Sequence, residues 1–224
     1  MSHTFLAVDT SATASAAITR DHEVIAHRAT ESQRTHSEVL AGFITEVMTE
    51  AAIDPRTPGA LDGIFVGVGP GPFTGLRAGI ITAQTLAHTW NIPVYGVLSL
   101  DGLAHRVAVD AFRMGAEEFV VATDARRTEV YWAHYDNVAG QPQRIHGPFV
   151  TAATEVTELP VYGAGAGLYP DALYGMTGFT DAVPDATDIA AHGSLALRRG
   201  RGLEPVTPQY LRGHDATIPK QLRR

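Results

Sequence analysis

The feature that most constrains the fold of this chain is a pattern that occurs twice. An apolar segment ending in an aspartate, Phe5–Asp9, precedes a polar turn and a second apolar segment through Ala17-Ile18. The same order returns at Phe119–Asp124, again with a polar turn and a second apolar segment, Val130–His134. Short apolar runs separated by polar turns are typical of antiparallel strands. A repeated strand meander predicts two lobes of related structure.

After each meander the pattern changes to alternating helices and strands. In the first half, Thr35–Glu38 is a capping box of the form S/T-x-x-E, which opens a helix. Apolar residues follow it at spacings of three and four, in an unusually wide stripe. A further helix begins near Leu76, and Asp185 opens the last helix of the chain. This alternation predicts an α/β fold.

The wide apolar stripe also predicts a contact between subunits. It covers more of its helix than one sheet face needs, and the helix that begins near Leu76 offers a second apolar face beside it. Apolar surface left over on a helix pair tends to be buried against another such pair. The predicted interface residues are Leu40, Phe43, Ile44, Val47, Leu76, Ile80 and Ala83.

Composition excludes several classes of protein. The 224 residues are enough for one large or two small domains, and a net charge of −7 argues against a protein that grips nucleic acid by itself. There is no cysteine, so disulfides, a thiol nucleophile and a cysteine zinc site are excluded. No segment has the pattern of a signal peptide, and none approaches the ~20 apolar residues that would span a bilayer. We therefore expect a cytoplasmic protein without membrane contact.

The glycine-rich turn Gly67–Gly75 joins an apolar strand to the helix near Leu76. A strand, a glycine-rich turn and a helix together aim backbone N–H groups at an anion, usually a phosphate. A Walker P-loop is excluded because the only lysine is Lys220, and the G-x-G-x-x-G fingerprint is missed because Gly75 comes one place late. The alternative is a tight structural turn in which glycines admit backbone close to backbone. The loop alone leaves both open.

The two strand-ending aspartates, Asp9 and Asp124, are the other candidates for phosphate chemistry. In a two-lobed fold they would face each other across a cleft, where carboxylates hold Mg²⁺ with its waters while turn amides hold phosphates. The alternative is that each caps only its own turn. The candidate nucleotide- or phosphate-binding residues are Asp9, Thr10, Ser11, Gly69, Gly71, Thr74, Gly75 and Asp124.

The block Val66–Gly79, together with Leu6–Ser11, resembles the TsaB (YeaZ) family, and His36–Glu38 and Pro208–Arg212 match it as well. The resemblance covers nearly the whole chain, and the glycine block is specific to TsaB and its paralogue TsaD. It implies an actin/Hsp70/sugar-kinase-like α/β fold with two duplicated RNase-H-like lobes, which agrees with the internal repeat. We expect a first lobe in residues 1–105, a smaller second lobe in 106–205, and packing of 206–224 on the first.

The resemblance also implies a role in forming N6-threonylcarbamoyladenosine (t6A) at position 37 of tRNAs that read codons beginning with A. In that family TsaB is the non-catalytic scaffold or activator, TsaD transfers the threonylcarbamoyl group, and TsaE is a third component. The expected partners are therefore a TsaD-like transferase and a TsaE-like ATPase, with tRNA bound only through the complex. Alone, the chain is expected to form a homodimer.

One stretch separates this chain from the transferase. TsaD-type proteins carry a His-x-x-x-His metal site where this sequence has Gly96–Leu103, so Ser99 and Leu103 stand at the ligand positions. Leucine cannot bind a metal, and without both imidazoles the two-histidine site is lost. We therefore expect no metal site, no catalytic residue and no enzymatic activity.

The resemblance leaves one question of ligand and one of function open. The second lobe is short for a full nucleotide clamp, so we expect no tightly bound cofactor and leave open weak binding of ATP or ADP with Mg²⁺. The alternative function is an active small-molecule kinase of the same fold. A kinase needs a carboxylate base near the cleft and an adenosine pocket, to which Val161–Gly167 could contribute. The sequence contains no distinctive base motif.

Overall fold

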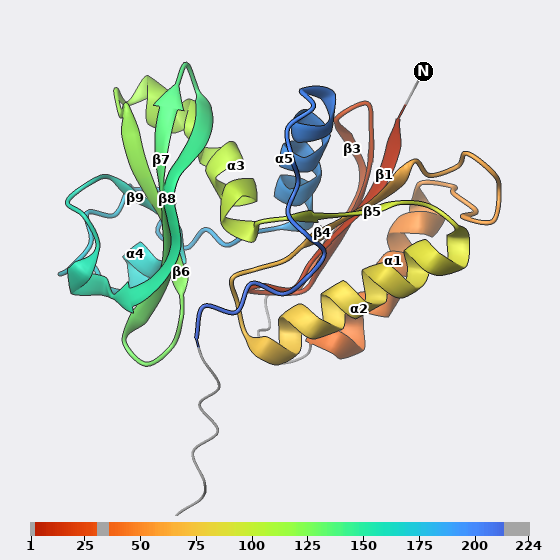
Figure 1. Cartoon of the computed structure of the whole chain (residues 1–224), viewed down its shortest axis with the longest axis horizontal. Coiled ribbons are helices and arrows are strands. Elements are labelled where there is room, and N and C mark those ends of the chain that lie inside the picture. Colours follow the sequence, from red (N-terminus) through yellow and green to blue (C-terminus); the bar gives the residue numbers. More distant parts are fainter. Residues whose placement is uncertain (1–2, 31–35, 213–224) are drawn as a thin grey trace, which may run out of the picture.

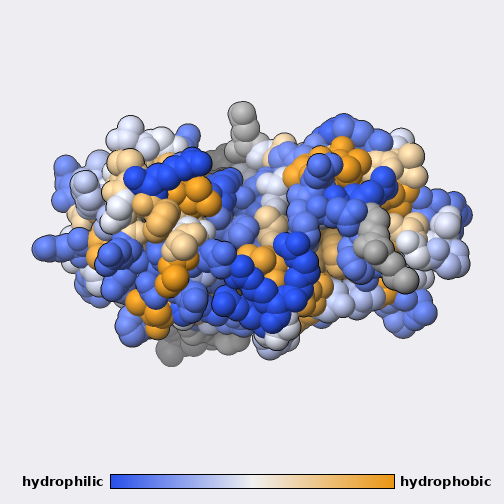
Figure 2. Space-filling model, turned by 90° about the horizontal axis from the view of Figure 1, so that it is seen from above, coloured by the Kyte–Doolittle hydropathy of each residue, from blue (hydrophilic) through white to orange (hydrophobic). Residues whose placement is uncertain are grey.

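A computed structural model describes residues 3–30 and 36–212, with the side chains of 36–38 left undescribed. It contains two β-sheets with helices packed on and between them (Figure 1). Thr35, the first residue of the predicted capping box, lies outside the described residues, as does the side chain of Glu38. Seen from above, the two lobes lie side by side, and their apolar surface residues gather in separate groups (Figure 2). None of the described helices is long and apolar enough to cross a membrane.

The first sheet has the strand order β3-β2-β1-β4-β5. Its strands are β1 (Thr4–Asp9), β2 (Ser15–Arg20), β3 (Glu23–Ala29), β4 (Gly63–Gly67) and β5 (Val94–Val97). The predicted meander is confirmed, because β1 pairs antiparallel with β2, and β2 with β3. β4 then joins β1 in parallel, after helix α1 (His36–Glu50), and α2 (Phe73–Trp90) leads on to β5.

The second sheet repeats the central part of this plan in the order β8-β7-β6-β9. Its strands are β6 (Glu118–Asp124), β7 (Glu129–Val138), β8 (Gln141–Ala152) and β9 (Val161–Tyr162). As in the first sheet, three antiparallel strands are followed by one that joins the first of them in parallel. The duplication predicted from the sequence is therefore present in the topology.

Strand β8 was not predicted from the sequence, and the reason is local. It contains Pro142 and Pro148, which cannot donate to a strand ladder and so obscure a strand pattern. β8 tolerates them because it is an edge strand, paired on one side only, with β7. The second half is also poorer in helix: only the short 3-10 helix η1 (Ala153–Glu155) and α4 (Ala164–Leu168) accompany its strands before the last helix.

The two lobes exchange a helix. α3 (Ser99–Arg113) follows the first sheet but packs on the second, with Leu103 and Val107 in one cluster with Phe119. α5 (Ala186–Arg198) follows the second sheet but packs on the first, where Ile189 joins the cluster of Phe5. The two helices also pack on each other between the sheets (Figure 1). The predicted boundary between residues 105 and 106 falls inside α3.

The two faces of the first sheet have different covers. Because side chains alternate along a strand, Leu6 and Val8 of β1 face α1 and α2, while Phe5 and Ala7 face α5. On α5, a Cβ at Gly193 would lie 2.5 Å from the Phe65 ring, so only glycine allows the helix this close to the sheet.

The apolar stripe on α1 belongs to this core, which corrects the predicted subunit interface. Six of the predicted interface side chains are buried within the chain: Leu40, Ile44, Val47, Leu76, Ile80 and Ala83. The seventh, Phe43, is partly buried against the same cluster. The stripe is wide because α1 packs both on the sheet and on α2. The six buried residues therefore offer no free surface to a partner, and Phe43 offers only part of its side chain.

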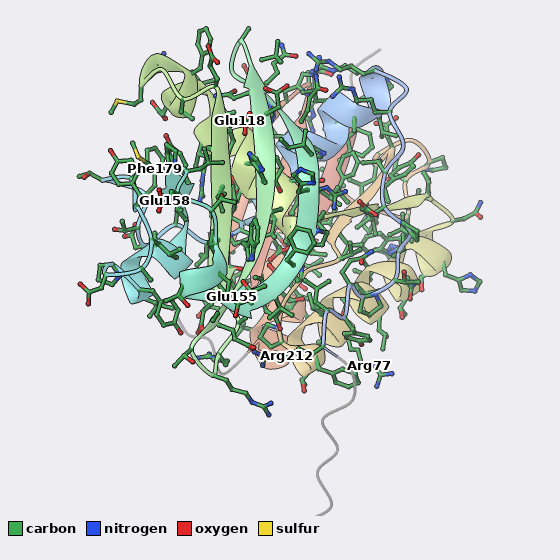
Figure 3. The ribbon with its side chains drawn as sticks, turned by 60° about the vertical axis from the view of Figure 1, so that its left-hand side comes forward. Arg77, Glu118, Glu155, Glu158, Phe179 and Arg212 are labelled. Carbon is green, nitrogen blue, oxygen red and sulfur yellow. The ribbon has the colours of Figure 1, made fainter. Side chains whose placement is uncertain are left out.

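The segment after α5 runs back over both lobes. We call residues 204–212 the strap. Glu204 pairs with Gly96 of β5, and the Gln209 amide donates to the Val68 carbonyl at 2.9 Å. At its far end Arg212 forms an ion pair with Glu129 of β7, on the second sheet (Figure 3). The strap thus connects the first sheet to the second.

Candidate functional site: the cleft between the lobes

A cleft of about 1230 Å³ lies between the two lobes. The turn between β1 and β2 contributes Ser11 and Thr13 to its lining, and the turn between β6 and β7 contributes Asp124 and Arg126. Residues 178–187 line the rest, together with part of β3 and the start of α4. Both repeats therefore supply the same turn to the cleft, which makes it the candidate functional site.

The two repeated aspartates occupy equivalent places and cap their own turns. The Ser11 backbone N–H donates to Asp9 Oδ1 at 2.8 Å, and the Arg126 N–H donates to Asp124 Oδ1 at 2.7 Å. Asp9 has no exposed surface, whereas Asp124 lines the cleft. The two carboxylates therefore do not face each other across the cleft, which corrects that expectation.

Asp9 instead joins the first strand to the start of α3. Ser99 Oγ donates to Asp9 Oδ2 at 2.7 Å, and the Gly69 N–H donates to Ser99 Oγ at 3.2 Å. Burial raises the pKa of Asp9 to about 6, against the lowering effect of its hydrogen bonds from Ser99 and Ser11. Ser99 and Leu103, which stand at the two metal-ligand positions of the resembled transferase, are both fully buried. The start of α3 is therefore buried, and its Ser99 hydroxyl connects it to β1 through Asp9.

The glycine-rich turn packs directly on the turn after β1. A Cβ at Gly67 would lie 1.7 Å from Asp9 Oδ2, and one at Gly71 would lie 2.4 Å from the Ser11 carbonyl oxygen. These separations are shorter than any that real Cβ atoms adopt, so glycine is required at both positions. The close approach agrees with the structural-turn alternative for this loop.

The other predicted phosphate-binding residues are likewise divided between the buried core and the cleft. Thr10 Oγ1 donates to the Gly75 carbonyl at 2.8 Å, which uses the hydroxyl inside the protein. Thr74 is exposed on the first turn of α2 and does not line the cleft. Ser11 and Asp124 are the predicted residues that the structure brings to the cleft. The buried remainder comprises Asp9, Thr10, Gly69, Gly71 and Gly75.

On the opposite wall, backbone amides at the start of α4 are already in use. The Gly163 N–H donates to the Phe179 carbonyl at 2.9 Å, and the Ala164 N–H donates to the Ala182 carbonyl at 2.7 Å. The segment through residues 179–182 therefore lies against the first amides of α4. The Ser11, Arg126, Gly163 and Ala164 amides thus donate to the chain's own oxygens.

Asp185 opens the last helix as predicted, and charged residues that the sequence analysis did not assign to the cleft surround it. Asp185 is the N-cap: its Oδ1 accepts from the Thr187 N–H at 2.8 Å, and its Oδ2 lies 2.9 Å from His27 Nε2. Asp188 Oδ2 accepts from the Asp185 N–H at 3.1 Å and pairs with Arg106 Nη1 at 3.2 Å. Burial, opposed by Arg106, raises the pKa of Asp188 to about 7. The spacing of the two aspartates is the signal that could have indicated this capping box.

The described residues contain no group of three or more histidine, aspartate or glutamate side chains that could hold a metal ion. Two of the cleft carboxylates, Asp124 and Asp185, are paired with cations or backbone amides, whereas the exposed Asp181 has no such partner among the described residues. Arg126, for example, lies 3.2 Å from Asp124 through Nη1. These pairs hold the turns and the start of α5 in place.

Comparison with known proteins gives one matching family and several relatives. A sequence model of the family described as TsaD, tRNA N6-adenosine threonylcarbamoyltransferase, matches residues 23–184. An uncharacterised protein of Mycobacterium tuberculosis is 37% identical over 217 residues, covering 95% of this chain and 93% of that protein. The tRNA threonylcarbamoyladenosine biosynthesis protein TsaB of Escherichia coli is 30% identical over 233 residues, covering 94% and 95%.

Among solved structures, YeaZ from Pseudomonas aeruginosa matches with a TM-score of 0.76 and 29% identity. The match covers 93% of this chain and 100% of that one. With the duplicated sheets described above, it confirms the predicted fold class: an α/β protein of the actin/Hsp70/sugar-kinase-like plan with two duplicated lobes.

Proposed function

This chain belongs to the TsaB (YeaZ) family, and from that premise we propose that it is a non-catalytic subunit in the biosynthesis of t6A in tRNA. In this role it binds and supports a TsaD-like transferase that modifies position 37 of tRNAs reading codons beginning with A. The name of the E. coli relative supports the biosynthetic role, and the match along 94% of the chain supports its transfer to this protein. A cytoplasmic location is part of the proposal, because tRNA is the molecule modified.

The observation that best supports the non-catalytic role is the hydrogen bond from Ser99 of α3 to Asp9 of β1. Serine and leucine stand where the transferase is expected to have its two imidazoles, and leucine offers no lone pair to a metal. Ser99 Oγ donates a hydrogen bond to Asp9 Oδ2 at 2.7 Å, and Leu103 is fully buried. These contacts support a structural role for both residues in place of a catalytic one.

The proposal includes the absence of a tightly bound nucleotide on this chain alone. Support comes from the amides of Ser11, Arg126, Gly163 and Ala164, which all donate to oxygens of the chain itself. The same observation argues against the kinase alternative. A kinase would in addition need a carboxylate base in the cleft; Asp124 and Asp185 already bind neighbouring groups there, which leaves the exposed Asp181.

For the partner surface we propose the exposed side of α2 in place of the buried stripe. Ile81 is 58% exposed there and Phe73 45%. Arg77 lies 4.4 Å above the Phe73 ring, and Tyr210 of the strap stacks on it at 4.9 Å. A rigid apolar group with an arginine is typical of protein interfaces. We propose that this surface binds the TsaD-like subunit, and a second copy when the chain is alone, with a TsaE-like ATPase and tRNA joining through the complex.

The test is nucleoside analysis of tRNA from a strain depleted of this protein. We expect t6A to disappear and to return when the wild-type chain is supplied. Normal t6A in the depleted strain, without a duplicate gene, would falsify the assignment. The non-catalytic part is tested separately on the purified chain: phosphate release near ~1 s⁻¹, an ordinary enzyme rate, or one firmly held metal ion per chain contradicts it.

A further inference from the structure

A second, smaller pocket lies away from the cleft, where α3, α5 and the start of β8 meet. Its volume is about 250 Å³, and residues 199–202 after α5 close one side of it. The lining of the pocket includes the side chains of Asp101, His105, Arg144, His192, Arg199 and Arg201. α5 ends at the top of the molecule (Figure 1), where the view from above shows strongly hydrophilic surface near the middle (Figure 2).

Two imidazoles face each other inside this pocket. The rings of His105 on α3 and His192 on α5 lie 6.1 Å apart, edge to face. Neither ring makes a hydrogen bond to another residue in the described part of the chain. Half-buried polar groups without partners lose hydrogen-bond energy. Their nitrogens are therefore available to a ligand.

The positive charge of the pocket is only partly neutralised from within. Arg144 is paired twice, through Nε with Asp101 at 3.4 Å and through Nη2 with Glu204 at 2.7 Å. Tyr135 donates its hydroxyl to the same Asp101 at 2.8 Å. Arg199 and Arg201 make no ion pair within residues 3–30 and 36–212. Two guanidinium groups at the rim thus remain without a counter-charge.

Burial and the surplus of positive charge lower the pKa values of the two histidines. Burial, and then His192 and Arg199, lower the pKa of His105 to about 4. Burial, and then Arg144 and Arg201, lower the pKa of His192 to about 4, opposed by Glu204. Both rings are therefore neutral at pH 7, and each offers one N–H donor. An anion bound between them would relieve the repulsion and favour the protonated rings.

We propose that this pocket binds the phosphate group of a small phosphate ester, which goes beyond the proposed role in tRNA modification. Arg199 and Arg201 bind the phosphate oxygens, and His105 and His192 donate further hydrogen bonds. Guanidinium groups match phosphate geometry, and the volume admits a phosphate with a sugar-sized group attached. On the far side Asp101, held by Tyr135 and Arg144, closes the pocket with an acceptor for a ligand hydroxyl.

The experiment follows the histidine signals of the whole chain by NMR, with ribose 5-phosphate and inorganic phosphate as probes and chloride at equal ionic strength as the reference. His105→Gln and His192→Gln assign the two signals. We expect phosphate probes to shift both signals in a saturable way and to raise both pKa values. Arg199→Gln and Arg201→Gln should each weaken binding about tenfold, a loss of about 1.4 kcal/mol.

The matched control is Arg198→Gln, an exposed arginine at the end of the same helix that does not line the pocket. It should bind the probes as the wild type does. Equal shifts in chloride, or equal weakening by Arg198→Gln, would show general ionic attraction and overturn the proposal. A short RNA that shifts the signals when neither small phosphate does so would also overturn it, in favour of a backbone phosphate. Loss of t6A in cells is independent of all these outcomes, so the two proposals fail separately.

Discussion

Two glycines of the first lobe differ in the space around them: Gly71 is tightly packed and Gly42 is not. Substitution by alanine should therefore have opposite effects on stability. A Cβ at Gly71 would lie 2.4 Å from the Ser11 carbonyl oxygen, whereas one at Gly42, on the exposed side of α1, meets nothing within 4 Å. Gly71→Ala should therefore cost about 2–3 kcal/mol of unfolding free energy, and Gly42→Ala should add about 0.5–1 kcal/mol. Urea denaturation of both variants measures this, and equal effects would contradict the packing described for the loop.

Asp188 makes stability depend on pH in a direction opposite to that of most carboxylates. Its pKa is about 7 in the folded chain against 3.8 for an ordinary aspartate, so the folded state keeps a proton that the unfolded state has lost. Wild-type stability from this group therefore falls as pH rises from about 4 to about 7. An asparagine side chain in its place cannot titrate but still accepts the hydrogen bond from the Asp185 N–H.

The stability of Asp188→Asn relative to wild type should thus increase between about pH 5 and about pH 8, by roughly 2–4 kcal/mol. Urea denaturation at the two pH values measures the difference. Asp110→Asn, at a half-exposed carboxylate on α3, is the matched control. A constant difference for Asp188→Asn would show that this carboxyl is ionised throughout.

At the scale of elements, α2 presents one face to the core and the other to solvent. Ile81 is 58% exposed, so Ile81→Asp should leave folding intact and weaken association with the TsaD-like subunit. Losing a buried isoleucine contact of about 1.5 kcal/mol corresponds to at least about a tenfold loss of affinity. Met114→Asp, at a 69% exposed apolar position on the other lobe, is the matched control. Normal binding by folded Ile81→Asp would place the interface elsewhere.

The strap contacts the second lobe at both of its ends, through Glu204 with Arg144 of β8 and through Arg212. Arg212 pairs with Glu129 and donates to the Arg126 carbonyl, so it ties the strap to the turn between β6 and β7. Arg212→Ala should cost no more than about 1 kcal/mol, because the pair is partly exposed. It should nevertheless speed hydrogen exchange of residues 125–129 and leave the β1–β2 turn unchanged. Unchanged exchange in both turns would mean that the Arg212 contact does not hold the turn between β6 and β7.

At the scale of the whole molecule, the exchange of α3 and α5 predicts that the lobes unfold together. The chain has two tryptophans: Trp90 at the end of α2 and Trp132 within the second sheet. Trp90→Phe and Trp132→Phe leave one fluorescent reporter in each lobe. Both should give the same urea midpoint after correction for the substitution, because each sheet is covered by a helix from the other half. Two separate midpoints would show independent lobes.

Patterns within short segments were enough to predict most elements of this protein. Alternation and turn residues predicted both meanders, because a strand of period two and a polar turn are local properties. The repeat of Phe5–Asp9 at Phe119–Asp124 predicted the two-lobed fold. β8 escaped prediction because an edge strand does not need an uninterrupted ladder.

Only the tertiary structure decided what the apolar stripe and the polar turns contact. Leu40 and Val47 have the same sequence pattern whether they face a partner or the core, and here the packing of α1 on both the sheet and α2 buries them. Asp9 likewise is a candidate cleft residue by sequence, whereas in the structure Ser99 and the glycine-rich turn cover it. His105 and His192 are far apart in sequence and meet because α3 and α5 cross between the lobes. Periodicity specifies which face of an element is apolar, and the arrangement of the elements specifies what covers that face.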